Sequence, residues 1–256
     1  MIKIILAGFY GKMGQAAIDM IHKNDQFQLV AVYGPHASAH TELVPELNGK
    51  DIFEQLSDDF PSADVWVDLS IPSAVFENVQ FALNRHLTPV VGTTGLKDDQ
   101  VQTLTKLSEE EHLGGLIVPN FSLSAVLLMQ FAKQAAKYFP NAEVIEMHHE
   151  DKLDAPSGTA LRTASLIEEG RTEAPINLTN VEEQPARGQL SNSVPIHAVR
   201  LPGYVAHEQV LFGSKGEALT IRQDSFSRDA FMPGLELAIL KVSTLKELTI
   251  GLENIL

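Results

Sequence analysis

Residues 2–14 have the sequence Ile-Lys-Ile-Ile-Leu-Ala-Gly-Phe-Tyr-Gly-Lys-Met-Gly, and this stretch sets the expected fold of the N-terminal half. Ile2 to Ala7 is a continuous apolar run rich in β-branched residues, which is typical of a strand buried on both faces of a parallel sheet. Glycines with the spacing G-x-x-G-x-x-G follow from Gly8, and a helical pattern continues to Ile21. This order of strand, glycine turn and helix favours a dinucleotide-binding loop over a plain tight turn.

Strand-like and helix-like patterns go on alternating after this unit. We expect strands at 27–33, 63–69, 88–91 and 115–118, and helices at 74–86, 96–111 and 124–139. We expect the acidic stretch 41–59 to be a loop with little structure. Strands that alternate with helices predict a parallel sheet, so the N-terminal half is expected to be a Rossmann-like α/β domain.

The second half of the chain has a different pattern. After an alternating strand at 142–147 and a helix from about Ala160, three strand-like runs at 194–201, 207–212 and 218–223 predict an antiparallel meander. We expect 172–192 to be loop and 229–248 to be a final helix that returns to the first domain. The prediction is therefore an α+β second domain with a mostly antiparallel open sheet and a hinge near Leu123.

Composition limits the classes of function. The formal net charge of −14 over 256 residues argues against nucleic acid or an anionic membrane as a partner. The sequence has no cysteine, which excludes disulfides, thiolate metal sites and a cysteine nucleophile and fits a reducing compartment. The start of the chain lacks the pattern of a signal peptide, and no apolar run is long enough to cross a bilayer. We therefore expect a cytoplasmic protein.

The chemistry is concentrated in residues 146–160, Glu-Met-His-His-Glu-Asp-Lys-Leu-Asp-Ala-Pro-Ser-Gly-Thr-Ala. His148, His149 and Lys152 can each carry a proton, and Gly158 and Thr159 lie at a helix start, where backbone amides and the helix dipole favour an anion. A solvated polar loop explains the same residue types about as well. A metal site is disfavoured because adjacent strand residues point to opposite faces.

The whole stretch resembles a known signature. Glu146-x-His148-His149-x-x-Lys152-x-Asp154-Ala155-Pro156-Ser157-Gly158-Thr159-Ala160 is similar to the motif of the 4-hydroxy-tetrahydrodipicolinate reductase family, also called the dihydrodipicolinate reductase family. Further matches in the second half are Arg187, Gly188, Arg200, Gly203 and His207, so the resemblance spans nearly the whole chain. It implies an NAD(P)H-dependent oxidoreductase that reduces 4-hydroxy-tetrahydrodipicolinate to tetrahydrodipicolinate, with loss of water, in the diaminopimelate route of lysine biosynthesis.

The resemblance also implies roles for the residues of this motif. His148 is the expected principal proton donor or acceptor, and Lys152 is the second acid and a carboxylate partner. His149, Gly158 and Thr159 are expected to hold the carboxylates of a small dicarboxylate substrate. No metal is expected.

The cofactor is expected to contact three segments. They are Gly8-Phe9-Tyr10-Gly11-Lys12-Met13, Gly92-Thr93-Thr94 beside the nicotinamide ribose, and Val118-Pro119-Asn120-Phe121 beside the nicotinamide. The second strand ends in Tyr33-Gly34-Pro35-His36, without the usual acidic residue for the adenosine ribose. This favours NADPH and leaves use of NADH open, since the segment also lacks an arginine for the 2′-phosphate.

The family further implies how the chain is divided and assembled. Residues 1–122 plus 229–256 are the expected dinucleotide-binding domain, and 123–228 the expected substrate-binding and tetramerisation domain of a homotetramer. Two other classes of protein fit the sequence less well. A thioester-forming semialdehyde dehydrogenase needs a cysteine, which this chain lacks. A non-catalytic nicotinamide-binding regulator does not need the intact His148, His149 and Lys152.

Overall fold

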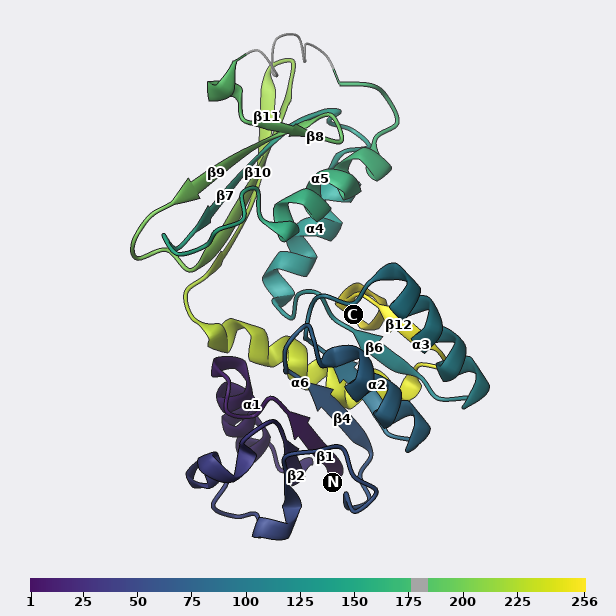
Figure 1. Cartoon of the computed structure of the whole chain (residues 1–256). Coiled ribbons are helices and arrows are strands. Elements are labelled where there is room, and N and C mark those ends of the chain that lie inside the picture. The colour runs from purple at the N-terminus through teal and green to yellow at the C-terminus, as the bar shows by residue number, and fades with distance from the viewer. Residues whose placement is uncertain (176–183) are drawn as a thin grey trace. The chain divides into compact units, whose positions relative to one another are not determined.

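The computed structural model describes residues 1–175 and 184–256. The chain forms two compact units (Figure 1). Unit 1 comprises Met1–Phe121 and Phe231–Leu256, and unit 2 comprises Ser122–Ala230.

Unit 1 is built on a seven-stranded sheet in the order β12-β6-β5-β4-β1-β2-β3, and every strand pair is parallel. Its strands are β1 Ile2–Ala7, β2 Phe27–Tyr33, β3 Ile52–Phe53, β4 Val65–Asp68, β5 Thr88–Val91, β6 Gly115–Ile117 and β12 Leu248–Ile250. Its α-helices are α1 Lys12–Lys23, α2 Val75–Asn84, α3 Asp98–Glu110 and α6 Met232–Lys241. The strand order reverses between β1 and β4, and an open parallel sheet binds its ligand at the carboxyl ends of the strands beside such a reversal.

Both faces of this sheet are buried. Ile5 and Trp66 pack with Phe60 in one core cluster, and Val79 and Leu104 pack with neighbours in another. Burial on two faces explains why the strands are continuous apolar runs rather than alternating ones. The predicted Rossmann-like α/β fold is confirmed.

Two expectations for unit 1 were wrong in detail. The stretch 41–59, expected to be a loop with little structure, contains a 3₁₀ turn at Gly49–Asp51 and the strand β3, which pairs with β2. Phe53 of β3 stacks on Phe60 with ring centroids 3.9 Å apart, so a tertiary contact holds a strand too short to show a period. The helix expected to run to residue 248 ends at Lys241, and β12 then adds to the edge of the sheet beside β6.

Unit 2 contains a five-stranded sheet in the order β11-β10-β7-β9-β8. Its strands are β7 Asn141–His148, β8 Gln189–Ser191, β9 Val194–Arg200, β10 Ala206–Ser214 and β11 Glu217–Ser225. The helices α4 Leu123–Ala135 and α5 Gly158–Gly170 contact each other and one face of the sheet (Figure 1). The prediction of a second, mostly antiparallel open sheet is confirmed.

The strand order corrects the predicted meander. β10 and β11 form the expected hairpin, but β7 lies between β9 and β10 and pairs with β9 in parallel. Alternating polarity defines which face of a strand is buried but not which strand lies beside it, so this insertion left no trace in the pattern. The loop expected at 172–192 includes the 3₁₀ turn Pro185–Arg187 and β8, while 176–183 lie outside the described residues.

Candidate functional site

In unit 2 the predicted catalytic stretch begins at the end of β7 and finishes at the start of α5. β7 ends at His148, residues 149–157 form the connection, and α5 begins at Gly158. The Ser157 hydroxyl caps the helix by accepting a hydrogen bond from the Ala160 amide at 3.2 Å. The sequence placed this helix start near Ala160, two residues beyond the observed one.

A buried carboxylate lies beneath this connection. Glu146 is fully buried, and its oxygens accept hydrogen bonds from His148 Nδ1 at 2.6 Å and from the Ser157 amide at 3.0 Å. The Arg200 guanidinium donates to both of its oxygens, at 2.7 and 2.8 Å. Burial raises the pKa of Glu146, but these hydrogen bonds, led by that from His148, outweigh burial and lower the pKa to about 2. Glu146 is therefore a carboxylate throughout the neutral pH range.

Arg200 joins this carboxylate to the connecting loop. Its guanidinium also donates to the carbonyl oxygens of Lys152 at 3.2 Å and Asp154 at 2.6 Å. A planar guanidinium bound to a carboxylate in the bidentate manner has a fixed orientation. The two carbonyls that it binds are held in a defined place relative to the end of β7.

The two side chains predicted to transfer a proton, His148 and Lys152, lie beside Glu146 and on the loop that Arg200 binds. His148 is partly buried and in contact with Glu146, and Lys152 forms an ion pair with Asp154 at 2.7 Å. The hydrogen bond from Lys152 lowers the pKa of Asp154. His149 and Gly158 are exposed, and Thr159 is partly buried in the first turn of α5. The structure thus brings the five residues predicted for catalysis and substrate binding into one short segment organised by Glu146 and Arg200.

In unit 1 the three segments predicted to contact a cofactor all follow parallel strands, β1, β5 and β6, at their carboxyl ends. Gly8 directly follows β1 with φ 78°, and a Cβ there would lie 2.3 Å from the Leu69 carbonyl oxygen. α1 begins at Lys12, directly after the exposed Gly11. Strand, glycine turn and helix N-terminus therefore have the arrangement that binds a pyrophosphate.

The aromatic side chains of these segments are core residues. Phe9 is fully buried and Phe121 is 4% exposed. A Cβ on Gly92 would lie 2.4 Å from the Phe121 ring, so glycine lets this ring pack against the loop after β5. Val118 is buried too, and its amide donates to the Val91 carbonyl at 2.7 Å. Lys12 and Thr94 are exposed, whereas Tyr10, Met13 and Asn120 are partly buried and Pro119 is exposed.

A second buried carboxylate supports the loops of unit 1. Asp68, at the end of β4, is fully buried. Its side chain accepts hydrogen bonds from Ser70 Oγ at 2.6 Å, Thr93 Oγ1 at 2.6 Å and Asn78 Nδ2 at 2.8 Å. Its carbonyl oxygen also accepts from the amides of Gly92 and Thr93. Asp68 therefore fixes the loop after β5 relative to the loop after β4.

The segment after β2 has no carboxylate, as the sequence shows. The Tyr10 hydroxyl donates to the Pro35 carbonyl at 2.8 Å, and its ring stacks on His40 with centroids 4.6 Å apart. Gly34 is close to this ring, since a Cβ there would lie 2.8 Å from Tyr10 Cε1. The glycine loop and the end of β2 are thus held together by one tyrosine.

Sequence reasoning gave no role to Glu146, Arg200 or Asp68. A signal existed for Glu146, because it precedes His148 by two residues on a strand and so shares its face. Asp68 ends a strand next to the predicted ligand edge, which is also a usable signal. Arg200 lies on β9, and only the tertiary pairing of β9 with β7 brings it to Glu146.

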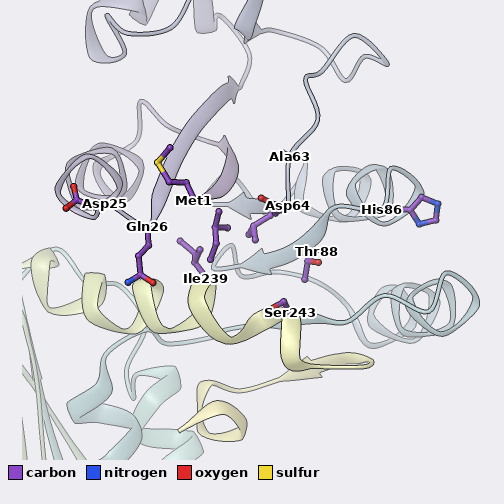
Figure 2. A pocket seen from close by; sticks show the side chains of 11 residues that line it. Met1, Asp25, Gln26, Ala63, Asp64, His86, Thr88, Ile239 and Ser243 are labelled. Carbon is purple, nitrogen blue, oxygen red and sulfur yellow. The ribbon is translucent and has the colours of Figure 1, made fainter.

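A cavity of about 720 Å³ in unit 1 lies elsewhere, at the amino ends of β1, β4 and β5 (Figure 2). Its lining includes Met1, Asp25, Asp64, Thr88 and Ser243 and contains none of the predicted site residues. Within residues 1–175 and 184–256, no three histidine or acidic side chains gather as a metal site. None of the helices described is long and apolar enough to span a membrane.

Comparison with known proteins gives a consistent result along the whole chain. Residues 2–121 match the family model "Dihydrodipicolinate reductase, N-terminus", and residues 124–256 match "Dihydrodipicolinate reductase, C-terminus". The 4-hydroxy-tetrahydrodipicolinate reductase of Limosilactobacillus fermentum is 53% identical over 262 residues, covering 100% of both chains. That of Lactiplantibacillus plantarum is 50% identical over 261 residues, again covering 100% of both.

Solved structures agree with this result. The dipicolinate-bound dihydrodipicolinate reductase from Paenisporosarcina sp. TG-14 matches with a TM-score of 0.84 and 41% identity, covering 100% of both chains. A scyllo-inositol dehydrogenase from Lactobacillus casei matches with a TM-score of 0.66 but only 13% identity, covering 99% of this chain and 91% of the other. The second likeness concerns the fold alone.

Proposed function

This chain belongs to the dihydrodipicolinate reductase family, and on that premise we propose that it reduces 4-hydroxy-tetrahydrodipicolinate to tetrahydrodipicolinate with NADPH or NADH. In this reaction a hydride and a proton add to the substrate ring and water leaves. The product continues on the diaminopimelate route to lysine. The observation that carries the proposal is the His148–Glu146–Arg200 cluster next to the N-terminus of α5, since it combines a proton-transfer group with an anion-binding helix end.

We assign the proton transfer to His148. Its Nδ1 is engaged by Glu146, which leaves Nε2 as the atom that exchanges a proton with substrate. Lys152 is the second acid and a partner for a substrate carboxylate, held by Asp154 until substrate binds. A positioned general acid contributes about 10²–10⁴-fold to the rate.

The substrate carboxylates are assigned to His149, Gly158 and Thr159. The N-terminus of α5 carries the positive end of the helix dipole, and its amides can bind an anion. Gly158 is suited to close approach, because a Cβ there would meet no atom within 4 Å and the surface at this point is open. The Lys152 ammonium, the His149 imidazole and one helix end can together bind two carboxylates on a small ring.

Unit 1 is the proposed cofactor-binding domain. The residues fit a dinucleotide, because Gly8, Gly11 and the start of α1 form a pyrophosphate loop beside the strand-order reversal of a parallel sheet. A bound nicotinamide cofactor would supply the hydride. The loops at 92–94 and 118–121, held by Asp68 and by the β5–β6 pairing, are the proposed support for the nicotinamide end.

We propose that both NADPH and NADH are accepted, with NADPH favoured. The segment Tyr33-Gly34-Pro35-His36 presents no carboxylate to repel a 2′-phosphate. Lys12 is exposed at the start of α1, and His40 is held nearby through its stacking on Tyr10. These residues supply positive charge or hydrogen bonds but no arginine fork, so the discrimination between the two cofactors is expected to be modest.

Unit 2 is the proposed substrate-binding and self-association domain of a cytoplasmic homotetramer. One face of its sheet is covered by α4 and α5, while the other carries half-buried Ile145, Val199 and Leu211. A partly exposed apolar face of this kind is suited to contact with further copies of the chain. The proposed reaction draws on the cytoplasmic pool of reduced nicotinamide. Sedimentation of the purified protein tests the tetramer.

Binding of pyridine-2,6-dicarboxylate tests the proposed substrate class. This planar dicarboxylate resembles the substrate ring, so we expect it to raise the melting temperature and to inhibit turnover. Pyridine-2-carboxylate, with one carboxylate, is the matched control ligand and should do much less. Cofactor binding without any effect of the dicarboxylate would support the regulator hypothesis and contradict the reductase.

A further inference from the structure

The fully buried carboxylate of Glu146 is the only group to which the Nδ1 atom of His148 is hydrogen-bonded among the bonds seen in the described residues. The two residues lie two positions apart on β7, so both side chains point to the same face of the sheet. A carboxylate can only accept a hydrogen bond. The proton of the 2.6 Å contact therefore belongs to Nδ1, and Nε2 is left as the second ring nitrogen.

Arg200 also fixes Glu146. It binds both carboxylate oxygens and also the carbonyls of Lys152 and Asp154, while Ser157 donates its amide to Glu146. The carboxylate therefore connects the ring of His148, the loop that carries Lys152 and the capping residue of α5. A change at Glu146 reaches all three, although its own side chain is fully buried.

We propose that Glu146 is a positioning residue, whose carboxylate sets the ring orientation and the Nδ1–H tautomer of His148 so that Nε2 is the atom that exchanges the proton with substrate. This inference rests on the proposed function in that it names the role of His148. Through Arg200, the same carboxylate also holds the loop that carries Lys152 at a fixed place relative to the His148 ring.

Glu208 is a matched control residue for substitutions of Glu146. Glu208 lies on the neighbouring strand β10, directly opposite Glu146 in the antiparallel register, and is 2% exposed. Its side chain is hydrogen-bonded to Thr163 of α5. Glu146 and Glu208 thus share the sheet face and the burial, but only Glu146 bonds to His148. The titratable and charged groups around His148 come from several elements: Glu146 on β7, Arg200 on β9, Glu208 on β10, and the Lys152–Asp154 pair in the loop.

The first test reads the tautomer directly in the wild-type protein. Nitrogen NMR of protein labelled at histidine distinguishes protonated from bare ring nitrogens, and His148→Gln identifies the signals of His148. In spectra recorded over a pH series, we expect the neutral ring to have a protonated Nδ1 and a bare Nε2. A neutral His148 with its proton on Nε2 would overturn the proposal. This readout does not depend on activity, so it stands even if the protein reduces a different substrate.

The second test compares Glu146→Gln with Glu208→Gln. For Glu146→Gln we expect kcat to fall by roughly 10²-fold or more, with KM for reduced nicotinamide within about twofold of wild type. The midpoint of the alkaline fall in kcat should also differ from that of wild type, because the ring no longer lies beside a carboxylate. A merely structural role would not move this midpoint. Glu208→Gln should keep both kcat and the midpoint near their wild-type values.

Two outcomes of the second test contradict the proposal. They are an unchanged alkaline midpoint in Glu146→Gln and an equal loss of kcat in the two variants. If Glu146→Gln does not fold because Arg200 is left unpaired, the double variant Glu146→Gln/Arg200→Gln removes both charges and carries the same expectation for the midpoint. If the wild type is inactive with the expected substrate, the proposed function fails, whereas an active wild type with an unaffected Glu146→Gln removes only this inference.

Discussion

Each unit of this protein contains a fully buried carboxylate at or near the end of a strand, and these are Asp68 in unit 1 and Glu146 in unit 2. The difference between them lies in their donors. Asp68 is bonded by neutral groups, the hydroxyls of Ser70 and Thr93 and the Asn78 amide. Glu146 is bonded by the Arg200 guanidinium, by an imidazole and by a backbone amide.

This difference corresponds to the two tasks that we assign to the units. Neutral donors around Asp68 tie two loops together without a cation, which suits a domain that binds a cofactor chiefly with its backbone. The hydrogen bonds that Glu146 accepts, led by that from His148 and followed by those from Arg200, lower its pKa to about 2 and keep it ionised. A buried carboxylate can therefore serve as a fixed anchor or as part of a proton-transfer pair, and its donors decide which.

The largest expected effect concerns the proton-transfer pair. His148→Gln should lower kcat by about 10²–10⁴-fold, because the general acid is removed while the buried carboxylate and the loop remain. Lys152→Ala should also lower turnover and should in addition raise KM for the substrate. Steady-state kinetics with both variants measures these changes. Normal turnover in both would show that the proton-transfer site lies elsewhere.

The second prediction concerns Glu208, a buried carboxyl of the same sheet that has neither a histidine nor an arginine as its hydrogen-bond partner. Glu208 is buried on the same face with a neutral partner, and burial raises its pKa to about 7. The folded protein therefore holds a proton that the unfolded chain loses above its ordinary pKa of 4.5, so stability is lost as pH rises from about 4.5 to 7.

Glu208→Gln should remove this loss of stability with rising pH, because a glutamine side chain does not titrate. Relative to wild type, its unfolding free energy should be higher at about pH 8 by on the order of 1–3 kcal/mol and nearly equal at about pH 4. Urea unfolding at the two pH values provides the measurement. If the unfolding free energies of variant and wild type differed by the same amount at both pH values, Glu208 would not titrate in this range.

The smallest expected effect concerns the anchor in unit 1. Asp68→Asn replaces an acceptor oxygen by a donor that faces other donors, so the loops after β4 and β5 should loosen at a cost of about 1–3 kcal/mol. We expect KM for reduced nicotinamide to rise by about tenfold, with the affinity for pyridine-2,6-dicarboxylate unchanged. Calorimetric titration of each ligand separates the two. Loss of dicarboxylate binding with cofactor binding intact would reverse the assignment of the units.

The sequence was sufficient wherever a pattern was local. The stretch 2–14 predicted β1, its glycine turn and α1, and the motif from Glu146 to Ala160 named the family that the comparisons later showed. Prediction from the sequence failed where an element depends on contacts between residues that are far apart in the chain. β3 depends on Phe60, β12 depends on β6, and the position of β7 between β9 and β10 depends on pairing that no period records.

The same limit applies to the candidate site. His148 and Lys152 are visible in the sequence as residue types in a motif, but the group that orients the histidine emerges only from hydrogen bonds within a folded sheet. Arg200 reaches Glu146 from 54 residues away in the sequence, and no spacing rule predicts that approach. The strand period links Glu146 to His148, so this half of the arrangement could have been inferred.

The measurement that tests the account most directly is consumption of reduced nicotinamide by the purified protein, with 4-hydroxy-tetrahydrodipicolinate generated in place by its synthase from pyruvate and aspartate semialdehyde. We expect rapid consumption that depends on the synthase, that pyridine-2,6-dicarboxylate inhibits, and that is somewhat faster with NADPH than with NADH. No consumption with either cofactor, in protein that binds them, would contradict the account and identify the chain as a nicotinamide-binding protein without this chemistry.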